Sequence, residues 1–400
     1  MKRYKVAFLI SHPIQYYAPL FRLLSAHHNV DLTVYFCFKW GLETFFDSGF
    51  GQTYKWDIPL TEGYQHIFLR NYSLKPAPTF FGQVNPGIFW ELATKKYDAC
   101  IVHGYVSLTN WFAFLGCWLT KTPIIIKGEA DLFKSIAAWK KAIKRVVLTA
   151  LFKRVSAALY SYTLNKQFFR FFGIPEEKLF FYPCAVDNDF FQEKARSLKK
   201  KRGSLKKQAG IGKLRFPTIL FVGKFIPRKR VSELLQAALL LQNKGTRFNL
   251  VLVGDGPQRS DLERFVKEYS LENIYFSGFK NQSELPQYYA LADVFVLPSE
   301  FDPSPKALNE AMNFGLVPVV SNGVGTAPDL IEKTGSGFVY ALGDVHELAD
   351  HLNQVIKYRG KREKFSRNAL ETVKQWSFQE DISGILRALA YVNLSPKHEA

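Results

Sequence analysis

The sequence contains little cysteine or methionine, with four cysteines and two methionines among 400 residues. No two cysteines form a Cys-x-x-Cys pair, and three of them lie in apolar runs; the four are Cys37, Cys100, Cys117 and Cys184. This pattern argues against a disulfide framework and against a zinc site built on cysteine pairs. We therefore predict buried thiols in a cytoplasmic protein.

Long hydrophobic runs are also lacking. No segment approaches the roughly 18 apolar residues that a transmembrane helix needs. The apolar run Val6 to Ile10 is too short for a signal peptide and is stopped by His12-Pro13. The longest apolar candidate, Trp111 to Leu119, fits a buried helix better than a membrane span. We expect neither a secretion signal nor a span.

Acidic residues are absent from two stretches that carry almost all of the formal charge of +18. Lys134 to Arg154 holds seven basic residues, and Lys194 to Arg215 holds ten. Charge concentrated in this way predicts two basic surface patches. A nucleic-acid-binding protein would show a steep salt dependence of binding, but no recognition motif accompanies either stretch. We therefore expect no nucleic acid among the partners.

The first basic stretch has the pattern of a helix from Ser135 to Val155. One expected stripe is apolar and should pack on its own domain, and it consists of Ile136, Ile143, Val147 and Leu151. The basic residues Lys140, Lys141, Lys144 and Arg145 lie elsewhere on the helix. Two interpretations stay open. Residues 134–154 form either a solvated face or a contact with an anionic membrane surface, on the inner face of the cell membrane.

The length of the chain suggests two domains. In each half, short apolar runs alternate with helical patterns, which is typical of a parallel sheet covered by helices. We predict an α/β protein with two doubly wound domains, at residues 1–190 and 216–376, joined by a basic linker at 191–215. Residues 39–96 look irregular, and so long an insertion often carries a function such as acceptor binding.

The apolar runs also predict the individual strands. In the first domain they are 4–10, 30–38, 98–102, 123–127, 157–161 and 179–182, and in the second they are 218–222, 248–253, 273–277, 294–297 and 317–320.

Glycines, lysines and acids follow four successive strands of the second domain. Because parallel strands end at the same edge of a sheet, one crevice can collect all of these residues. Two lysines beside a helix N-terminus would bind a diphosphate. The residues are Gly223, Lys224, Lys229, Gly254, Gly256, Gly278, Phe279, Asp302 and Glu310.

The helix after the fourth strand is predicted to begin at Pro305 with Ser304 as its N-cap. Gly315 is placed to end it in a left-handed turn. Since the helix start would hold phosphate, a carboxylate nearby should bind hydroxyl groups instead, and we assign Glu310 to that role. The alternative is a capped helix in a parallel sheet whose acids face solvent.

In the first domain, His103 follows the strand at 98–102 and Glu129 follows the strand at 123–127. His12 follows the first strand. Residues at these strand ends are candidates for a second ligand-binding site. A single histidine in such a place is more often structural, so this alternative stays open as well.

Taken over nearly its whole length, and most densely from 218 to 331, the chain resembles the retaining GT-B glycosyltransferases of family four. In the second domain the resemblance rests on FVGKFIPRK, VLVGDGP, FSGF and PSEFDPSPKALNEAM. In the first domain it rests on VHG at 102–104 and on LFFYPCAVDNDFF. The resemblance implies a GT-B fold, with two Rossmann-like domains that face each other across a cleft. It also implies a C-terminal helix, at about 377–395, that crosses back onto the first domain.

The resemblance implies a role for each matched residue. Lys224 and Lys229 would grip the diphosphate of a nucleotide-diphosphate-sugar donor, Asp302 would meet the donor sugar, and Glu310 the ribose. His103 would lie near the reacting centre, and the acceptor would bind in the first domain near it, with His12 and Glu129 as further acceptor-side candidates. No cofactor and no obligatory metal are implied. Together with the basic helix, the resemblance favours an acceptor that is a polyprenyl-linked or other lipid-linked glycan, or a cell-surface glycan.

The sequence departs from the family pattern at the donor loop. The first acid is Asp302 instead of glutamate, and Glu300 could share its role. Pro303 and Pro305 stand where the family often has glycine, and proline has no N–H to donate. Donor contacts there must therefore come from Ser304, Lys306 or Ala307. Another GT-B enzyme, such as a nucleotide-sugar epimerase, would need the same donor grip and is the alternative.

Overall fold

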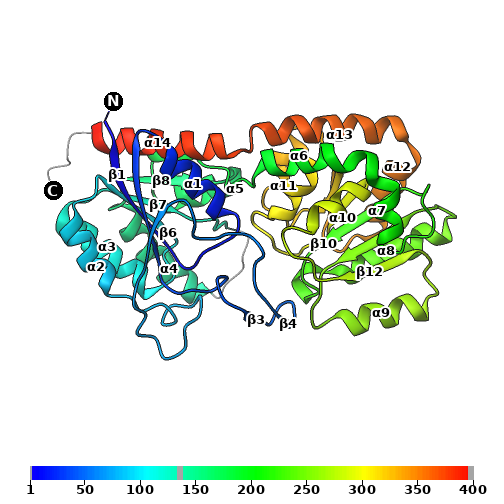
Figure 1. Cartoon of the computed structure of the whole chain (residues 1–400), viewed down its shortest axis with the longest axis horizontal. Coiled ribbons are helices and arrows are strands. Elements are labelled where there is room, and N and C mark those ends of the chain that lie inside the picture. Colours follow the sequence, from blue (N-terminus) through cyan, green and yellow to red (C-terminus); the bar gives the residue numbers. More distant parts are fainter. Residues whose placement is uncertain (1, 133–137, 395–400) are drawn as a thin grey trace. The chain divides into compact units, whose positions relative to one another are not determined.

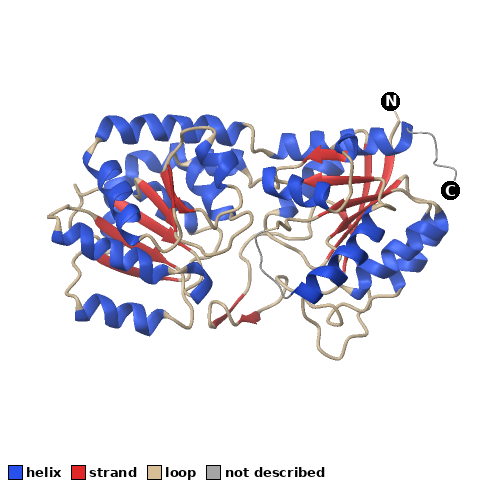
Figure 2. Ribbon diagram, turned by 180° about the vertical axis from the view of Figure 1, so that it is seen from behind, coloured by secondary structure: helices blue, strands red, loops and turns tan. Residues whose placement is uncertain are grey.

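The computed structural model describes residues 2–132 and 138–394, without the side chains of 138–142. The chain divides into two compact units. Unit 1 comprises Met1–Phe45, Ile58–Cys184 and Phe378–Ala400, and unit 2 comprises Phe46–Asp57 and Ala185–Ser377. Each unit is built on a β-sheet with helices on both of its faces (Figures 1 and 2).

Unit 1 contains a seven-stranded sheet in which each strand pairs in parallel with its neighbours. Its strands are β1 (Tyr4–Ile10), β2 (Val30–Phe36), β5 (Gln65–Phe68), β6 (Ala99–His103), β7 (Ile124–Lys127), β8 (Ala157–Tyr160) and β9 (Leu179–Phe181). Their order across the sheet is β5-β2-β1-β6-β7-β8-β9. The helices are α1 (Tyr17–Ala26), α2 (Gly87–Lys95), α3 (Leu108–Thr120), α4 (Ala138–Phe152), α5 (Thr163–Phe171) and α14 (Phe378–Leu394).

Unit 2 contains a six-stranded parallel sheet. Its strands are β10 (Thr218–Val222), β11 (Asn249–Val253), β12 (Ile274–Gly278), β13 (Val294–Leu297), β14 (Val317–Ser321) and β15 (Phe338–Tyr340), in the order β12-β11-β10-β13-β14-β15. Its helices are α6 (Asn188–Leu198), α7 (Arg202–Gln208), α8 (Val231–Asn243), α9 (Arg259–Glu268), α10 (Leu285–Leu291), α11 (Lys306–Asn313), α12 (Val345–Lys357) and α13 (Arg359–Lys374). The short strands β3 (Phe45–Asp47) and β4 (Gln52–Tyr54) pair with each other.

The central strands of both sheets are largely apolar because helices cover both faces of each sheet. The central strands β10, β11 and β13 are almost completely buried. The predictions for β1, β10 and β13 have the observed bounds, and the other predicted strands differ by one or two residues. The prediction of two doubly wound α/β domains is confirmed. All four cysteines are free and buried, also as predicted.

Residues 39–96 are more regular than the sequence predicted. β5 pairs with β2 at the edge of the first sheet, and α2 packs against α3. The side chain of Asn85 ties this region to the sheet, since its Nδ2 donates to the carbonyls of Cys37 at 2.9 Å and Leu69 at 3.1 Å. β5 escaped the prediction because an edge strand is short and half-exposed, so its apolar signal is weak.

The predicted boundary at residue 190 and the predicted linker at 191–215 differ from the structure. Unit 2 begins at Ala185, and most of residues 191–215 lie in α6 and α7, which pack against α10. Two basic residues act as anchors here. Arg202 pairs with Asp293 at 2.5 Å, and the buried Nζ of Lys206 donates to the carbonyls of Leu214 and Phe216. Burial lowers the pKa of Lys206 to about 8.

α4 has a different buried face from the one predicted. Leu151 is buried as expected, but Ile143 and Val147 are 56% and 39% exposed, and Val146 is 71% exposed. The buried partners of Leu151 on this helix are Leu148 and Phe152. From Ile143 to Leu151 the predicted stripe advanced in steps of four residues, and each such step turns a helix by about 40° beyond a full turn, so the stripe moved from the exposed face to the buried one. Ile136 lies outside the described residues, as do the side chains of Lys140 and Lys141.

No helix in the described ranges combines the length and the hydrophobicity that a membrane crossing requires.

The C-terminal helix α14 packs on β8 and β9 of unit 1, where Figure 1 shows it in red. Asp381 is buried there and accepts a hydrogen bond from the backbone N of Cys184 at 2.7 Å. The closest approach is at Gly384, where an added Cβ would lie 2.0 Å from the carbonyl oxygen of Phe181. Glycine at this position therefore lets the helix lie directly against the strand.

We expect Gly384→Ala to lower the free energy of unfolding by about 1–3 kcal/mol, because the new methyl group overpacks this contact. Gly360→Ala is the matched control, since Gly360 also lies in a helix but an added Cβ would meet nothing within 4 Å. That variant should keep the stability of the parent or gain up to about 1 kcal/mol. Denaturant titration of the whole chain measures both, and equal stability of the two variants would contradict the close packing of α14.

Candidate functional site

The sheet of unit 2 reverses its strand order between β10 and β13. At such a point the connections leave the sheet in opposite directions, and a crevice opens beyond the strand ends. Gly223 and Lys224 directly follow β10, and Asp302 lies in the loop after β13. The predicted donor-side residues are therefore placed where an open parallel sheet binds its ligands.

The glycines at these strand ends allow the backbones to approach one another closely. The N–H of Gly223 donates to the carbonyl of Val253 at 3.0 Å, and that of Gly254 donates to the carbonyl of Gly278 at 2.9 Å. An added Cβ on Gly254 would lie 1.8 Å from the carbonyl oxygen of Gly223. No side chain fits there, so the structure brings these three glycines together as predicted.

Both predicted phosphate-binding lysines are paired with aspartates. Lys229 forms an ion pair with Asp302, and the side chains of both are 13% exposed. Lys224 Nζ lies 2.9 Å and 2.8 Å from the two carboxylate oxygens of Asp47. Lys229 and Asp302 were predicted to share a site, whereas Asp47 was not predicted at all.

The loop of Asp302 is fixed by its backbone. Its N–H donates to the carbonyl of Gly323 at 3.0 Å, and its carbonyl accepts from the N–H of Gly325 at 2.9 Å. An added Cβ on Gly323 would lie 2.3 Å from the carbonyl oxygen of Glu300. The exposed Glu300 precedes this anchored loop, and its sharing the role of Asp302 stays a prediction.

The helix start differs by one residue from the prediction. α11 begins at Lys306, and Pro305 is its N-cap with an extended backbone, so Ser304 does not cap the helix. The Oγ of Ser304 accepts instead from Lys306 Nζ at 3.0 Å. Gly315 has a φ of 70° beyond the helix end, as expected. The first turn of α11, with Lys306 and Ala307, still presents the positive end of the helix dipole.

Glu310 is 1% exposed and already has a protein partner, because its Oε2 accepts a hydrogen bond from Tyr289 Oη at 2.6 Å. A weaker contact of 3.5 Å joins its Oε1 to Gln282 Nε2. The tyrosine partner was not predicted, since Tyr289 lies on α10 and is 21 residues away in sequence. Contact between Glu310 and a ribose stays a prediction.

Phe279 follows β12 and is packed between two other aromatic rings. Its ring centroid lies 4.9 Å from that of Phe50 and 4.5 Å from that of Tyr54. Gly256 is close to the same segment, since an added Cβ there would lie 2.8 Å from the carbonyl oxygen of Gly49. Residues 46–57 thus cover several of the predicted donor-side positions.

The sheet of unit 1 reverses its order between β1 and β6, and His12 and His103 lie at the ends of these two strands. His103 Nε2 lies 3.4 Å from both Tyr17 Oη and Lys127 Nζ. The ring of His12 stacks on Phe38 with 5.3 Å between centroids. Burial lowers the pKa of His12 to about 4, so its imidazole is neutral at pH 7.

Lys127 is a member of this group that the sequence analysis missed. It ends β7, its side chain is completely buried, and its Nζ lies 3.0 Å from Glu129 Oε1. The rings of Tyr17 and Tyr182 also face this ammonium group, at 5.3 and 5.6 Å. The sequence signal that could have found Lys127 was a lysine at the end of an apolar strand, directly before Gly-Glu. The pair fixes the position of Glu129, the third predicted acceptor-side residue.

The predicted residues thus form two groups, one at each sheet. The donor-side group lies in unit 2, and the acceptor-side group of His12, His103 and Glu129 lies in unit 1. Within the part of the chain that the structure describes, no group of three or more histidine, cysteine or acidic side chains is arranged to hold a metal ion.

A family model described as "Glycosyl transferases group 1" matches residues 205–372, which include the whole predicted donor-side group. The chain is 34% identical over 175 residues to the 2-deoxystreptamine glucosyltransferase of Streptomyces kanamyceticus, covering 44% of each chain. It is 28% identical over 204 residues to the GDP-mannose-dependent alpha-(1-6)-phosphatidylinositol monomannoside mannosyltransferase of Mycobacterium tuberculosis, covering 49% of this chain and 51% of that one. The chain spans about half the length of these curated relatives.

Among solved structures, the chain is similar to Anabaena HepE in complex with UDP and glucose, with a TM-score of 0.71 at 16% identity. This match covers 97% of this chain and 100% of that chain. Two Rossmann-like units and a likeness of this extent define the class, and the chain has the GT-B fold. Within that class, residues 205–372 match the model of the glycosyl transferases of group 1. The resemblance stated from the sequence is confirmed.

The contact between Glu310 and Tyr289 leads to a test of the ribose assignment. Glu310→Ala should weaken nucleotide binding, and it should also destabilise the fold by about 1–3 kcal/mol because the buried Tyr289 hydroxyl loses its carboxylate acceptor. Tyr289→Phe removes the same hydrogen bond but keeps the carboxylate, so it should leave nucleotide affinity close to that of the parent. Calorimetry measures both affinities. Equal losses in the two variants would mean that the pair only positions α11.

Proposed function

We propose that this chain transfers a sugar from a nucleotide-diphosphate donor to a hydroxyl group of an acceptor, with retention of the anomeric configuration. The observation that carries the proposal is the grouping of Lys224, Lys229 and Asp302 at the strand-order reversal of unit 2, inside the region that matches the family. The bond between the anomeric carbon and the diphosphate breaks, and a bond to the acceptor oxygen forms on the same face of the sugar. The acceptor hydroxyl passes its proton to the departing diphosphate, which leaves with the nucleotide.

The residues of unit 2 suit the leaving group of this reaction. Negative charge grows on the diphosphate as the sugar departs, and preformed positive groups stabilise it most strongly at that moment. Lys224, Lys229 and the N-terminus of α11 would supply this charge, so we propose a reaction that needs no metal. Asp302 would accept hydrogen bonds from the sugar hydroxyls, and Glu310 would hold the ribose.

The nature of the donor is suggested by the related proteins. The HepE structure contains UDP and glucose, and the Streptomyces relative is named a glucosyltransferase. We therefore infer a hexose donor, and uridine nucleotides are the first to test. An epimerase would bind the same donor but form no acceptor product, so product analysis separates the two.

We expect Lys224→Ala and Lys229→Ala each to slow sugar transfer by a factor on the order of 10²–10³, as for the loss of one oxyanion-hole donor. Ground-state donor affinity should fall less, because the charge develops fully only in the transition state. Single-turnover rates and calorimetric affinities give the two quantities. Rates close to those of the parent in both variants would place the diphosphate elsewhere.

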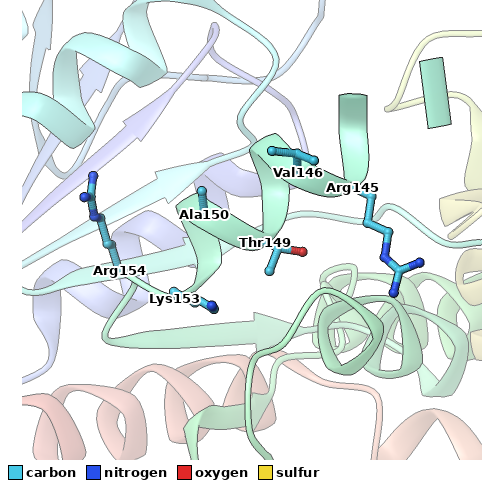
Figure 3. A pocket seen from close by; sticks show the side chains of 6 residues that line it. All are labelled: Arg145, Val146, Thr149, Ala150, Lys153 and Arg154. Carbon is cyan, nitrogen blue, oxygen red and sulfur yellow. The ribbon is translucent and has the colours of Figure 1, made fainter. Parts of the chain in front are cut away.

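The exposed side of α4 supports a membrane-bound acceptor. Arg145 and Val146 on this helix, and Lys153 and Arg154 just after it, line a surface pocket of about 540 Å³ together with Thr149 and Ala150 (Figure 3). Exposed valines and basic side chains on one helix are the combination that binds an anionic lipid surface. The mycobacterial relative is named for a phosphatidylinositol acceptor. We infer a lipid-linked or cell-surface glycan as acceptor and a peripheral location on the inner face of the cell membrane.

This surface gives a flotation test. The triple variant Arg145→Gln, Lys153→Gln, Arg154→Gln should bind anionic vesicles roughly 100-fold more weakly, since each basic residue contributes about 1 kcal/mol. Raising the salt from 0.1 to 1 M should release the parent, because the screening length falls from about 10 Å to about 3 Å. The matched control replaces three exposed lysines of the second basic stretch, Lys199, Lys200 and Lys201, with glutamine. Equal losses in both variants would indicate attraction by net charge alone.

A further inference from the structure

The segment of residues 46–57, called the 46–57 segment below, groups with unit 2 although its neighbours in the chain belong to unit 1. It contains β4 and most of β3, which form their own small sheet. The sequence suggested at most acceptor binding for the longer insertion at 39–96, and the matched family region at 205–372 does not include the segment. Its contacts, however, concentrate on the strand ends that form the predicted donor side.

The strongest of these contacts joins Asp47 to Lys224, which lie 177 residues apart in sequence. Both carboxylate oxygens of Asp47 accept from the ammonium group, at 2.9 and 2.8 Å. The ring of Phe50 covers the same ammonium group, with 4.9 Å between Nζ and the ring centroid. Lys224 is therefore held from two sides by the 46–57 segment.

The groups around Asp47 keep its carboxyl group negatively charged. Its Oδ1 also accepts from the N–H groups of Gly49 and Phe50, at 2.8 and 3.2 Å, and its Oδ2 accepts from Tyr54 Oη at 3.3 Å. Burial works to raise the pKa of this carboxyl, but the hydrogen bonds and the charge of Lys224 outweigh it and hold the pKa below its ordinary value. At neutral pH Lys224 thus faces a carboxylate.

The rest of the segment is anchored to the loop after β12. The rings of Phe50 and Tyr54 pack on Phe279, and Asn281 Nδ2 donates to the carbonyl of Lys55 at 2.7 Å. Ser283 hydrogen-bonds to the carboxylate of Asp57 through its N–H at 3.3 Å and through its hydroxyl. These contacts keep the carboxylate of Asp47 beside Lys224.

We propose that Asp47 pairs with Lys224 at the position that the donor diphosphate would take. Donor binding then requires Lys224 to exchange the carboxylate of Asp47 for phosphate. The 46–57 segment is then part of the donor site and sets the donor affinity. This inference rests on the proposed function, because it takes Lys224 as a diphosphate ligand. It concerns a residue outside the matched family region.

The exchange has a measurable consequence. When only part of the protein is ready to bind, the apparent dissociation constant is the intrinsic one divided by the fraction that is ready. An ion pair that must break first lowers this fraction. Removing the charge of Asp47 should therefore tighten binding of any ligand that uses Lys224, while ligands without a diphosphate should be unaffected.

The test is calorimetry of the full chain with UDP and with inorganic pyrophosphate. Asp47→Asn should bind both roughly 2- to 10-fold more tightly than the parent, the range expected from losing one partly exposed ion pair. The asparagine oxygen can still accept from Gly49 and Phe50, so the turn is retained. If this variant does not fold, Asp47→Ser tests the same point, since a serine oxygen can also accept from these N–H groups.

Two controls make the result specific. Asp261→Asn removes an exposed charge from α9 and should leave both affinities unchanged. In a Lys224→Ala background, Asp47→Asn should not raise either affinity, because the lysine that pairs with Asp47 is then absent.

The outcomes separate this inference from the proposed function. Affinities that are equal to or weaker than those of the parent overturn the inference alone, as does a gain that persists without Lys224. If neither parent nor variant binds UDP, GDP, ADP or pyrophosphate, the donor site itself is wrong, and the inference is overturned with it.

Discussion

The close approach of three strand ends in unit 2 is the constraint on which the candidate site depends. A Cβ at Gly254 would lie 1.8 Å from the carbonyl oxygen of Gly223, so only glycine permits this spacing. The backbone hydrogen bonds from Gly223 to Val253 and from Gly254 to Gly278 then hold the ends of β10, β11 and β12 together. Because of this packing, residues from separate motifs reach one edge of the sheet. The same packing positions Lys224, which follows β10. The parallel sheet supplies the edge, and the glycines determine how close its loops come.

Much of this arrangement could be predicted from the sequence. Buried parallel strands are short apolar runs with strong signals, and β10 and β13 were predicted with their observed bounds. Because parallel strands share one edge, the order of motifs along the chain was enough to place Lys229 and Asp302 together. The pairing of these two residues in the structure agrees with that reasoning. Local pattern and topology point to the same answer here, which is why the prediction succeeded.

The failures have a common physical cause, which is that side-chain pairs between distant segments leave no periodic signal. Asp47 meets Lys224 across 177 residues, and Tyr289 meets Glu310 from another helix. Lys127 looked like the polar end of an apolar strand, yet it is buried beside Glu129. On α4 the apolar residues occupy two adjacent faces, and periodicity alone could not tell which one the sheet covers. Each of these facts depends on tertiary packing and was open until the structure was known.

The charges around the two lysines also bear on which ligands such a site favours. Lys224 and Lys229 each have an aspartate partner, so an incoming anion does not meet bare ammonium groups but must replace or share a carboxylate. A ligand with one negative charge gains little, because it exchanges one ion pair for another and also loses solvation. Under the proposed function, a diphosphate would engage both lysines and the N-terminus of α11 at once, and its gain would then exceed the cost of the exchange. Internal ion pairs of this kind therefore favour diphosphates over singly charged ligands such as carboxylates, without any contact to a base or sugar.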